Sequence, residues 1–545
     1  MMKRRVLVLG LDGGTFDVIQ PLREKGRLPN LASLMSSGSY SPLLSTVPYA
    51  TIPAWPSFMT GVNAGKHGVF DFLMPAPGRV SRVVHSGDLA ERTLWQVLGD
   101  YGKRSIVLNV PCTYPPQPIH GVLVSGMLTP AGANCCFPRE YRETLDAQCG
   151  GYRVNEESSL SADRLLADLR VVAEKQTTAF AEALRTHRWD FAMLVFRGTD
   201  VVSHMFWEDR GAVEAFYAFV DELIGDLLCD WPDTLVIVMS DHGFQAQLKD
   251  FHVNRWLMQK GLLHTREVSD SPRLAAKRRL DGRQRLHQDL TPTLVTRALH
   301  RIGVTRQRLH SWLPERVRHW AVAHAGVSLE ALIPKGPDFE VDPQQSIASA
   351  VQQFTTETKG ISVFVPRASA DYDATIDGIV RALYSVRDPE TGAAVVAAAH
   401  RREELYHGPY VGRAPEIIFE LAPGYNITNN LWAGRPITPR ARIRGCHSRE
   451  GVLIASGPDI RRGVQFEGVM PSLYDIAPTV LHYLGLPIPQ VCDGRLLTEL
   501  LASGSTLSRR APTSAEGKRY ETTQPVKARH ERTKIRQRLR KLGYL

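Results

Sequence analysis

Short runs of continuously apolar residues constrain the fold of this chain more than any other feature of its sequence. Seven such runs occur, at residues 6–12, 105–111, 121–126, 191–196, 234–241, 417–421 and 451–457. Apolar and polar residues do not alternate within them, which is typical of strands that are buried on both faces. Helical patterns at 162–186 and 212–229 lie between these runs. Strands that alternate with helices predict an α/β sandwich around a mostly parallel central sheet.

The formal charge of +10 is concentrated in two segments, residues 273–318 and 509–545. Each holds 12 Lys/Arg against 3 Asp/Glu, whereas the rest of the chain holds 42 against 50. The first segment lies within 265–345, where Arg-rich helical patterns and no strand predict an inserted basic helical cap. Residues 506–545 are rich in Ser, Thr, Pro, Lys and Arg and predict a basic linker and C-terminal tail. Residues 1–264 and 346–505 would then form one discontinuous α/β domain.

The two basic segments allow several interpretations. The cap could overhang a site and attract an anionic substrate, or it could be a solvated helical surface. The tail could contact nucleic acid or an anionic membrane surface, because Lys/Arg clusters bind polyanions. No nucleic-acid-binding motif accompanies it, so a solubilising or docking tail is the preferred interpretation. The sequence does not indicate an oligomeric state.

The sequence also limits the class of protein. It has no run of about eighteen apolar residues, so we expect no membrane span. The short N-terminal apolar run ends at Asp12 without a small-residue cleavage site, which favours a first strand over a signal peptide and, by default, a cytoplasmic location. The seven cysteines show no CxxC pairing, which argues against a disulfide framework and against a thiolate zinc site.

Acidic and histidine residues follow three of the apolar runs. Asp12 closes the first run, Asp200 lies just beyond 191–196, and Asp241 closes 234–241 together with His242. In open α/β sheets, ligands bind at the carboxyl ends of the strands, so these side chains should gather at one edge. Asp241 and His242 are adjacent and would point to opposite faces of a straight strand. They can converge only where that strand has ended.

Asp200 and His204 are four residues apart, which on a helical turn places both on one face, able to bind one metal ion. His447 precedes the run at 451–457 and could be a third ligand. Each of these residues alone also has an ordinary structural interpretation, as a helix cap or as a surface or core side chain. Their joint arrangement favours a metal site.

Several longer motifs resemble those of a known family. They are GLDGGTFD, TIPAWPSFMTGVNAGKHGVFDF, VLNVPCTYPPQPIHGVLVSGMLTP, GTDVVSHMFW, SDHGF, GCHSREGVLIASGPDI and DIAPTVLHYLGLPIP, in order from residue 10 to 489. Together they resemble the type I phosphodiesterase/nucleotide pyrophosphatase family of the alkaline phosphatase superfamily. The resemblance covers everything except the cap and the tail. It implies an alkaline-phosphatase-like α/β sandwich.

The resemblance also implies a mechanism and a set of site residues. Two divalent metal ions, zinc or alternatively manganese, would be bound at the matching positions. One ion would be held by Asp200, His204 and His447, and the other by Asp12, Asp241, His242 and Thr51. Thr51, in the Pro-rich stretch TIPAWP, would be the nucleophile and form a phosphothreonine intermediate, because contact with a metal ion lowers the pKa of a hydroxyl. Tyr49 and Trp55 flank Thr51 and could either stack on a substrate ring or pack inside the protein.

These expectations define the predicted function. The chain would be a metal-dependent hydrolase of small anionic phosphate diesters or pyrophosphates. The alternatives are a phosphomonoesterase or phosphotransferase with the same site, and a catalytically silent scaffold that binds a polyanion. A sulfatase is disfavoured, because TIPAW lacks the Cys or Ser and the Arg that formylglycine formation needs.

Overall fold

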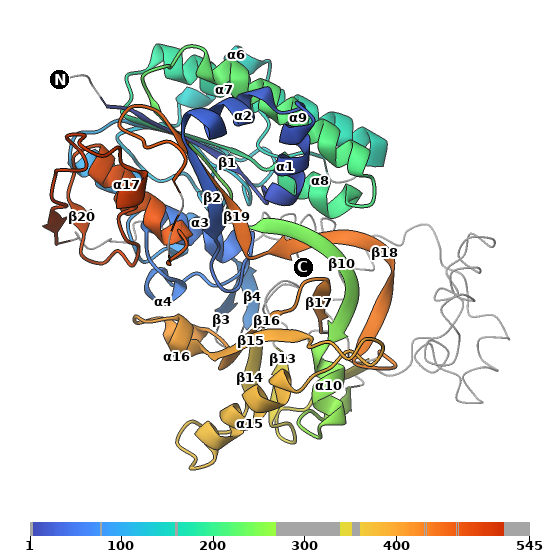
Figure 1. The fold of residues 1–545 in the computed structure, drawn as a ribbon. Coiled ribbons are helices and arrows are strands. Elements are labelled where there is room, and N and C mark those ends of the chain that lie inside the picture. The colour runs from blue at the N-terminus through green and yellow to red at the C-terminus, as the bar shows by residue number, and fades with distance from the viewer. Residues whose placement is uncertain are drawn as a thin grey trace.

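The computed structural model of this 545-residue chain describes residues 4–516, except 77–78, 158–161, 269–337, 351–359, 430, 432, 465 and 467. All seven predicted strands are present, with ends at most three residues from the predicted ones. The two predicted helices are also present, as α7 (Ala162–Thr186) and α9 (Arg210–Leu228). The α/β prediction is therefore confirmed (Figure 1).

Eight strands form the central sheet. Their order across the sheet is β2 (Ser39–Leu44), β19 (Glu450–Ser456), β9 (Leu235–Met239), β1 (Val6–Leu11), β8 (Phe191–Phe196), β5 (Ser105–Leu108), β6 (Gly121–Val124) and β7 (Cys136–Phe137). The five strands from β9 to β6 are parallel to one another, and β19, β2 and β7 pair antiparallel with their neighbours. Every residue of β1, β8 and β9 is buried, as strands covered on both faces should be.

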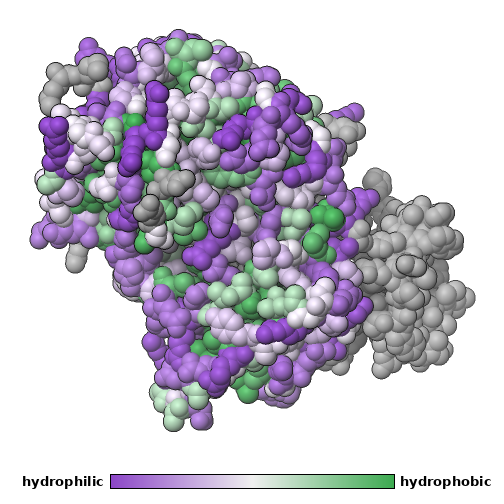
Figure 2. Space-filling model, viewed as in Figure 1, coloured by the Kyte–Doolittle hydropathy of each residue, from purple (hydrophilic) through white to green (hydrophobic). Residues whose placement is uncertain are grey.

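Helices cover both faces of this sheet. Helices α1 (Phe16–Glu24), α2 (Pro29–Ser37), α7 and α9 lie together on one side of the sheet (Figure 1). Helices α3 (Thr51–Thr60), α5 (Leu94–Asp100) and α17 (Ile476–Tyr483) pack on the other side. The large core formed between these layers keeps the carboxyl edge of the parallel strands in a fixed position. The face of the molecule in Figure 2 is mostly hydrophilic to intermediate, with scattered hydrophobic residues.

A second, smaller layer carries its own core. Strands β13 (Ala348–Ala350), β14 (Gly360–Val363), β16 (Ile417–Leu421) and β15 (Val396–Arg401) form an antiparallel sheet. Helices α10 (Val253–Gln259) and α15 (Tyr372–Tyr384) pack beside it. The apolar run at 417–421 therefore belongs to this sheet rather than to the central one. An apolar run indicates burial on both faces but does not identify which sheet provides the neighbours.

A long antiparallel ribbon connects the two layers. It consists of β10 (Gly243–His252) and β18 (Ile437–Ser448), with β17 (Tyr425–Thr428) parallel to β10 on its other side. In Figure 1 the ribbon runs from the central sheet to the smaller layer. Its upper end, where Phe244 pairs with His447, lies at the carboxyl edge of the central sheet.

The two predicted basic modules lie mostly outside the described residues. At the ends of the predicted cap, β11 (Thr265–Val268) pairs antiparallel with β12 (Asp338–Val341), so the expectation of no strand in 265–345 is wrong at both ends. The first residues of the predicted linker also differ from the expectation. Leu507 is buried, and β21 (Ser514–Ala515) pairs with β20 (Ile488–Pro489). Long-range contacts such as these, together with the hydrogen bond from Arg510 to the carbonyl of Gly485, hold this segment, and a compositional signal does not detect them.

Within the described residues, no helix is both long enough and apolar enough to cross a membrane.

Candidate active site

The carboxyl edge of the parallel strands gathers the predicted site residues. Asp12 follows β1 directly, and Asp241 and His242 lie in the short turn between β9 and β10. The N–H of Asp12 donates to the carbonyl of Phe196, the last residue of β8, at 3.1 Å, and α8 (Gly198–Phe206) begins two residues later. This edge is where an open α/β sheet binds its ligands.

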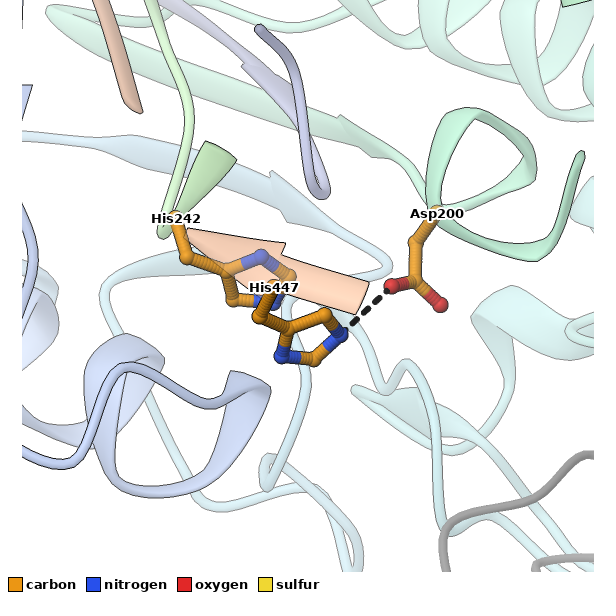
Figure 3. Close-up of side chains that lie close together, drawn as sticks. All are labelled: Asp200, His242 and His447. Carbon is orange, nitrogen blue, oxygen red and sulfur yellow. Dashed lines mark ion pairs between the residues drawn. The ribbon is translucent and has the colours of Figure 1, made fainter. Parts of the chain in front are cut away.

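One group of side chains comes from α8 and β18. Asp200 and His204 lie one turn apart on α8, with His204 Nε2 at 3.3 Å from Asp200 Oδ1. His447 Nε2 lies 3.2 Å from the same oxygen and 2.9 Å from His204 Nε2. Figure 3 shows His447 pointing at Asp200, with His242 beside it. The three atoms could all contact one ion, and we call these three residues the first group.

A second group lies beside it, at the ends of β1 and β9. His242 Nε2 is 3.2 Å from Asp241 Oδ2 and 3.8 Å from Asp12 Oδ1. Ligand atoms of Asp12, Asp241 and His242, the second group, lie within 4.8 Å of one another. The same holds for Asp200, His242 and His447, because the His242 and His447 rings stack at 3.5 Å between centroids. His242 is therefore within reach of both groups, which the residue spacing does not predict.

Thr51 is the first residue of α3 and faces the second group. Its Oγ1 lies 3.3 Å from His242 Nε2, and the side chain is fully buried. The structure thus brings all seven predicted residues to one place. Their roles as metal ligands and nucleophile stay a prediction.

Backbone carbonyls fix the orientation of all three histidines. Nδ1 of His204, His242 and His447 lies 3.2, 3.2 and 3.3 Å from the carbonyl oxygens of Gly445, Gly243 and Tyr49 respectively. A carbonyl oxygen only accepts, so each Nδ1 carries a proton. The three Nε2 atoms face the carboxylates, where a protonated ring donates to the carboxylate and a neutral ring can bind a metal ion. Metal-binding histidines are typically held this way.

The carboxylates show opposite electrostatic effects. Burial, together with the charges of Asp241 and Asp200, holds the pKa of Asp12 well above its usual range. Burial likewise raises the pKa of Asp241, with the charge of Asp200 adding to it. For Asp200, burial also acts to raise the pKa, but the charges and hydrogen bonds of His204 and His447 outweigh it and hold the pKa well below its usual range. Burial, with the charge of His447, lowers the pKa of His242.

The residues present fit divalent metal ions. Asp12 Oδ1 and Asp241 Oδ2 are buried and accept no hydrogen bond from the residues that the structure describes. The Nε2 atoms of His204 and His447 are only 2.9 Å apart, although both Nδ1 atoms carry protons. A cation would stabilise the two facing nitrogen atoms of the first group, and another cation would stabilise the two buried carboxylate oxygens of the second group. The set of carboxylate oxygens and imidazole nitrogens suits zinc and similar divalent ions.

The sequence did not predict the role of Trp55. Its indole Nε1 donates to Asp12 Oδ2 at 3.3 Å, and the side chain is fully buried, so it is not available to stack on a substrate. Tyr49 is also buried, and its carbonyl accepts from His447. Of the two interpretations of these aromatic residues, the structure supports packing. The only signal in the sequence for this role of Trp55 was its position, four residues after the predicted nucleophile.

Comparisons with known proteins agree with this geometry. The family model described as type I phosphodiesterase/nucleotide pyrophosphatase matches residues 6–450. The fold and the family match define an alkaline-phosphatase-like phosphoester hydrolase. The chain belongs to the type I phosphodiesterase/nucleotide pyrophosphatase family, whose members depend on metal ions. Among curated proteins, none matches the chain.

Similarity to solved structures occurs at low sequence identity, and the phosphonoacetate hydrolase structures share the fold. Phosphonoacetate hydrolase from Sinorhizobium meliloti 1021, in complex with phosphonoformate, is 13% identical with a TM-score of 0.51, covering 89% of this chain and 95% of that one. The complex of the same enzyme with phosphonoacetate gives the same values. Human ectonucleotide pyrophosphatase/phosphodiesterase 5 is 14% identical with a TM-score of 0.49, covering 92% of this chain and 100% of that one.

Proposed function

We propose that this chain hydrolyses small anionic phosphate diesters or pyrophosphates through a phosphothreonine intermediate on Thr51, with two divalent metal ions. The observation that carries the proposal is the position of Thr51 Oγ1, 3.3 Å from His242 Nε2 and beside the two ligand groups. Membership of the phosphodiesterase family supports the reaction type.

The first group, Asp200, His204 and His447, would hold one ion. The second group, Asp12, Asp241 and His242, would hold the other together with Thr51. Zinc is the proposed metal and manganese the alternative, because the ligands combine imidazole with carboxylate. When bound, such ions lower the pKa of a coordinated hydroxyl and stabilise the negative charge on phosphoryl oxygens.

The remaining chemistry belongs to the chain itself. Thr51 Oγ attacks phosphorus, the bond from phosphorus to the leaving oxygen breaks, and the alcohol or phosphate departs. Water then attacks the phosphothreonine, which breaks the bond from phosphorus to Oγ and restores the hydroxyl. Each step inverts the configuration at phosphorus, so the net result is retention.

Helix α3 would contribute to charge stabilisation. Ile52 has non-helical φ and ψ of −114° and 114°, so the regular helix begins after it, and Thr51 lies just before the N-terminus, where the backbone favours anions. Not every N–H is available there, because Pro53 has none and the N–H of Ala54 donates to the carbonyl of Ala50 at 3.0 Å. Among the three residues that follow Thr51, only Ile52 has a backbone N–H that could contact a phosphoryl oxygen.

A pair of threonine variants tests the proposal. Thr60 lies at the other end of α3 and its hydroxyl donates to the carbonyl of Pro56, so Thr60→Ala is the matched control for Thr51→Ala. With zinc present, we expect bis-(p-nitrophenyl) phosphate to be hydrolysed faster than p-nitrophenyl phosphate. Thr51→Ala should lower both rates by about 10⁴-fold or more and abolish a phosphoenzyme trapped by acid quench, whereas Thr60→Ala should not.

Three outcomes would contradict the proposal. Hydrolysis by Thr51→Ala at the wild-type rate would remove the nucleophile. Monoester hydrolysis faster than diester hydrolysis would instead favour a phosphomonoesterase that uses the same residues. A metal-free, inactive wild-type protein would favour the polyanion-binding scaffold.

A further inference from the structure

The indole of Trp55 lies between the nucleophile helix and a predicted metal ligand. Trp55 is on α3, which begins at Thr51, and its ring fits against β1 only because residue 10 is glycine. A Cβ on Gly10 would lie 2.7 Å from the Cη2 atom of the indole. The ring also packs edge-on against Phe58, with centroids 5.8 Å apart and planes at 89°. The indole is thus held tightly on several sides.

This packing directs the only polar atom of the side chain at Asp12. Trp55 Nε1 lies 3.3 Å from Asp12 Oδ2. The other oxygen, Oδ1, lies 3.8 Å from His242 Nε2 and accepts no hydrogen bond within the described part of the chain. The two oxygens of one carboxylate therefore have different environments. One contacts the indole, and one faces the second ligand group.

Hydrophobic packing alone does not require this contact. A phenylalanine could fill most of the same space without placing a donor beside a carboxylate. An indole N–H buried in a protein needs an acceptor, and here the acceptor is a predicted metal ligand rather than a backbone carbonyl. Hydrogen bonds to the ligands of a metal fix their orientation, and their loss typically weakens metal binding about 10- to 100-fold.

We propose that Trp55 is a positioning residue, which binds Asp12 Oδ2 so that Asp12 offers only Oδ1 to the metal of the second group. This proposal rests on the proposed function, because it assumes that Asp12 is a metal ligand. The same hydrogen bond connects α3, and with it Thr51, to the second group. The Trp55 side chain would then fix the position of the nucleophile Thr51 relative to the metal.

Trp189 provides a matched control. It is also a fully buried tryptophan whose Nε1 donates a hydrogen bond, in this case to the carbonyl of Leu184 at 3.2 Å. It precedes β8, at the opposite edge of the sheet from the ligand groups. Trp55→Phe and Trp189→Phe therefore remove the same chemical group from two buried sites. Only the first removal touches a predicted ligand.

The test measures zinc affinity of the full chain by competition with a chromophoric chelator. We expect wild type and Trp189→Phe to bind two zinc ions alike. Trp55→Phe should bind one ion with unchanged affinity and the other about 10- to 100-fold more weakly. Gly10→Ala is a second variant, which keeps the indole but forces it away from β1, and it should weaken the same ion.

The outcomes separate this inference from the proposed function. If Trp55→Phe and Gly10→Ala bind both ions as tightly as wild type does, Trp55 does not position Asp12, even where Thr51→Ala is inactive. Equal weakening by Trp55→Phe and Trp189→Phe would assign the effect to packing and would also overturn the inference. A wild-type protein that binds no zinc or manganese would overturn both proposals.

Discussion

The two ligand groups are neighbours, yet they differ in charge and in burial. The first group has one carboxylate and two imidazoles, and the His204 side chain is 16% exposed. The second group has two carboxylates and one imidazole, all fully buried. The first is assembled from α8 and the β18 ribbon, whereas the second comes from the turns that end β1 and β9.

This difference shows that burial alone does not set the pKa of a carboxylate. Asp200 and Asp12 are equally buried, but the pKa of Asp200 is held low by His204 and His447, while that of Asp12 is held high. The first group supplies its own balancing charge. The second group has too few cations, so its folded form depends more on a bound metal ion.

The largest expected effect is on hydrolysis and metal content. Asp200→Ala and Asp241→Ala should each lower diester hydrolysis by about 10³-fold, since losing one metal removes about 4 kcal/mol of transition-state stabilisation. Each should retain one zinc ion by elemental analysis. His242→Ala should lose more, because His242 reaches both groups. Asp221→Asn is the control, because this buried carboxylate accepts from the backbone of Asn30 and Leu31 instead. Loss of both ions in Asp200→Ala would mean that the two groups form one cooperative site.

A smaller effect, of opposite sign in the two groups, is expected on the stability of the metal-free protein. With a chelator at pH 7, Asp12→Asn should raise the free energy of unfolding by about 2 kcal/mol, because it removes a buried charge for which the hydrogen bond from Trp55 does not offset burial and the charges of Asp241 and Asp200. Asp200→Asn should lower it by a similar amount, because it leaves His204 and His447 without their carboxylate. Urea unfolding measures both values. A change of the same sign in both variants would end the distinction between the groups.

The pH dependence of stability should sharpen the same contrast, because the pKa values of Asp12 and Asp200 are shifted in opposite directions. The pKa of Asp12 is raised on folding, so its destabilising effect is absent below the unfolded pKa and grows as the pH rises toward the folded pKa. Relative to Asp12→Asn, metal-free wild type should therefore lose stability as the pH rises from about 4. The pKa of Asp200 is lowered, so its contribution is present above the unfolded value and is lost as the pH falls toward the folded pKa. Parallel pH profiles for the two variants would contradict this assignment.

Much of the fold was predictable because its signals are local. Continuous apolar runs such as 191–196 and 234–241 become β8 and β9 nearly residue for residue. The gathering of Asp12 and Asp241 at one edge follows from the general rule for parallel sheets. The antiparallel second sheet was not predicted, because β16 carries the same apolar signal as a central strand.

The sequence predicted that the candidate residues gather at one place, but not the contacts that support them; their roles stay a prediction. The spacing of Asp200 and His204 encodes one helical face, but the stacking of His242 on His447 joins positions 205 residues apart. The carbonyls that orient the histidines carry no sequence signal, because every residue has one. The sequence allowed Trp55 either to pack inside the protein or to stack on a substrate ring. Only the path of α3 across β1 reveals its contact with Asp12.

The smallest expected effect concerns the link between the two elements of the first group. Glu208, just after α8, accepts a hydrogen bond from the backbone N–H of Ile443 on β18 at 2.9 Å, and so ties the helix of His204 to the strand of His447. This contact is exposed, so Glu208→Ala should cost about 0.5 kcal/mol of stability. Zinc affinity of the first group should fall about twofold, with the second group unchanged. Glu214→Ala, which removes an exposed ion pair with Lys25, is the control, and an equal effect of the two variants on zinc binding would show that this link does not support the first group.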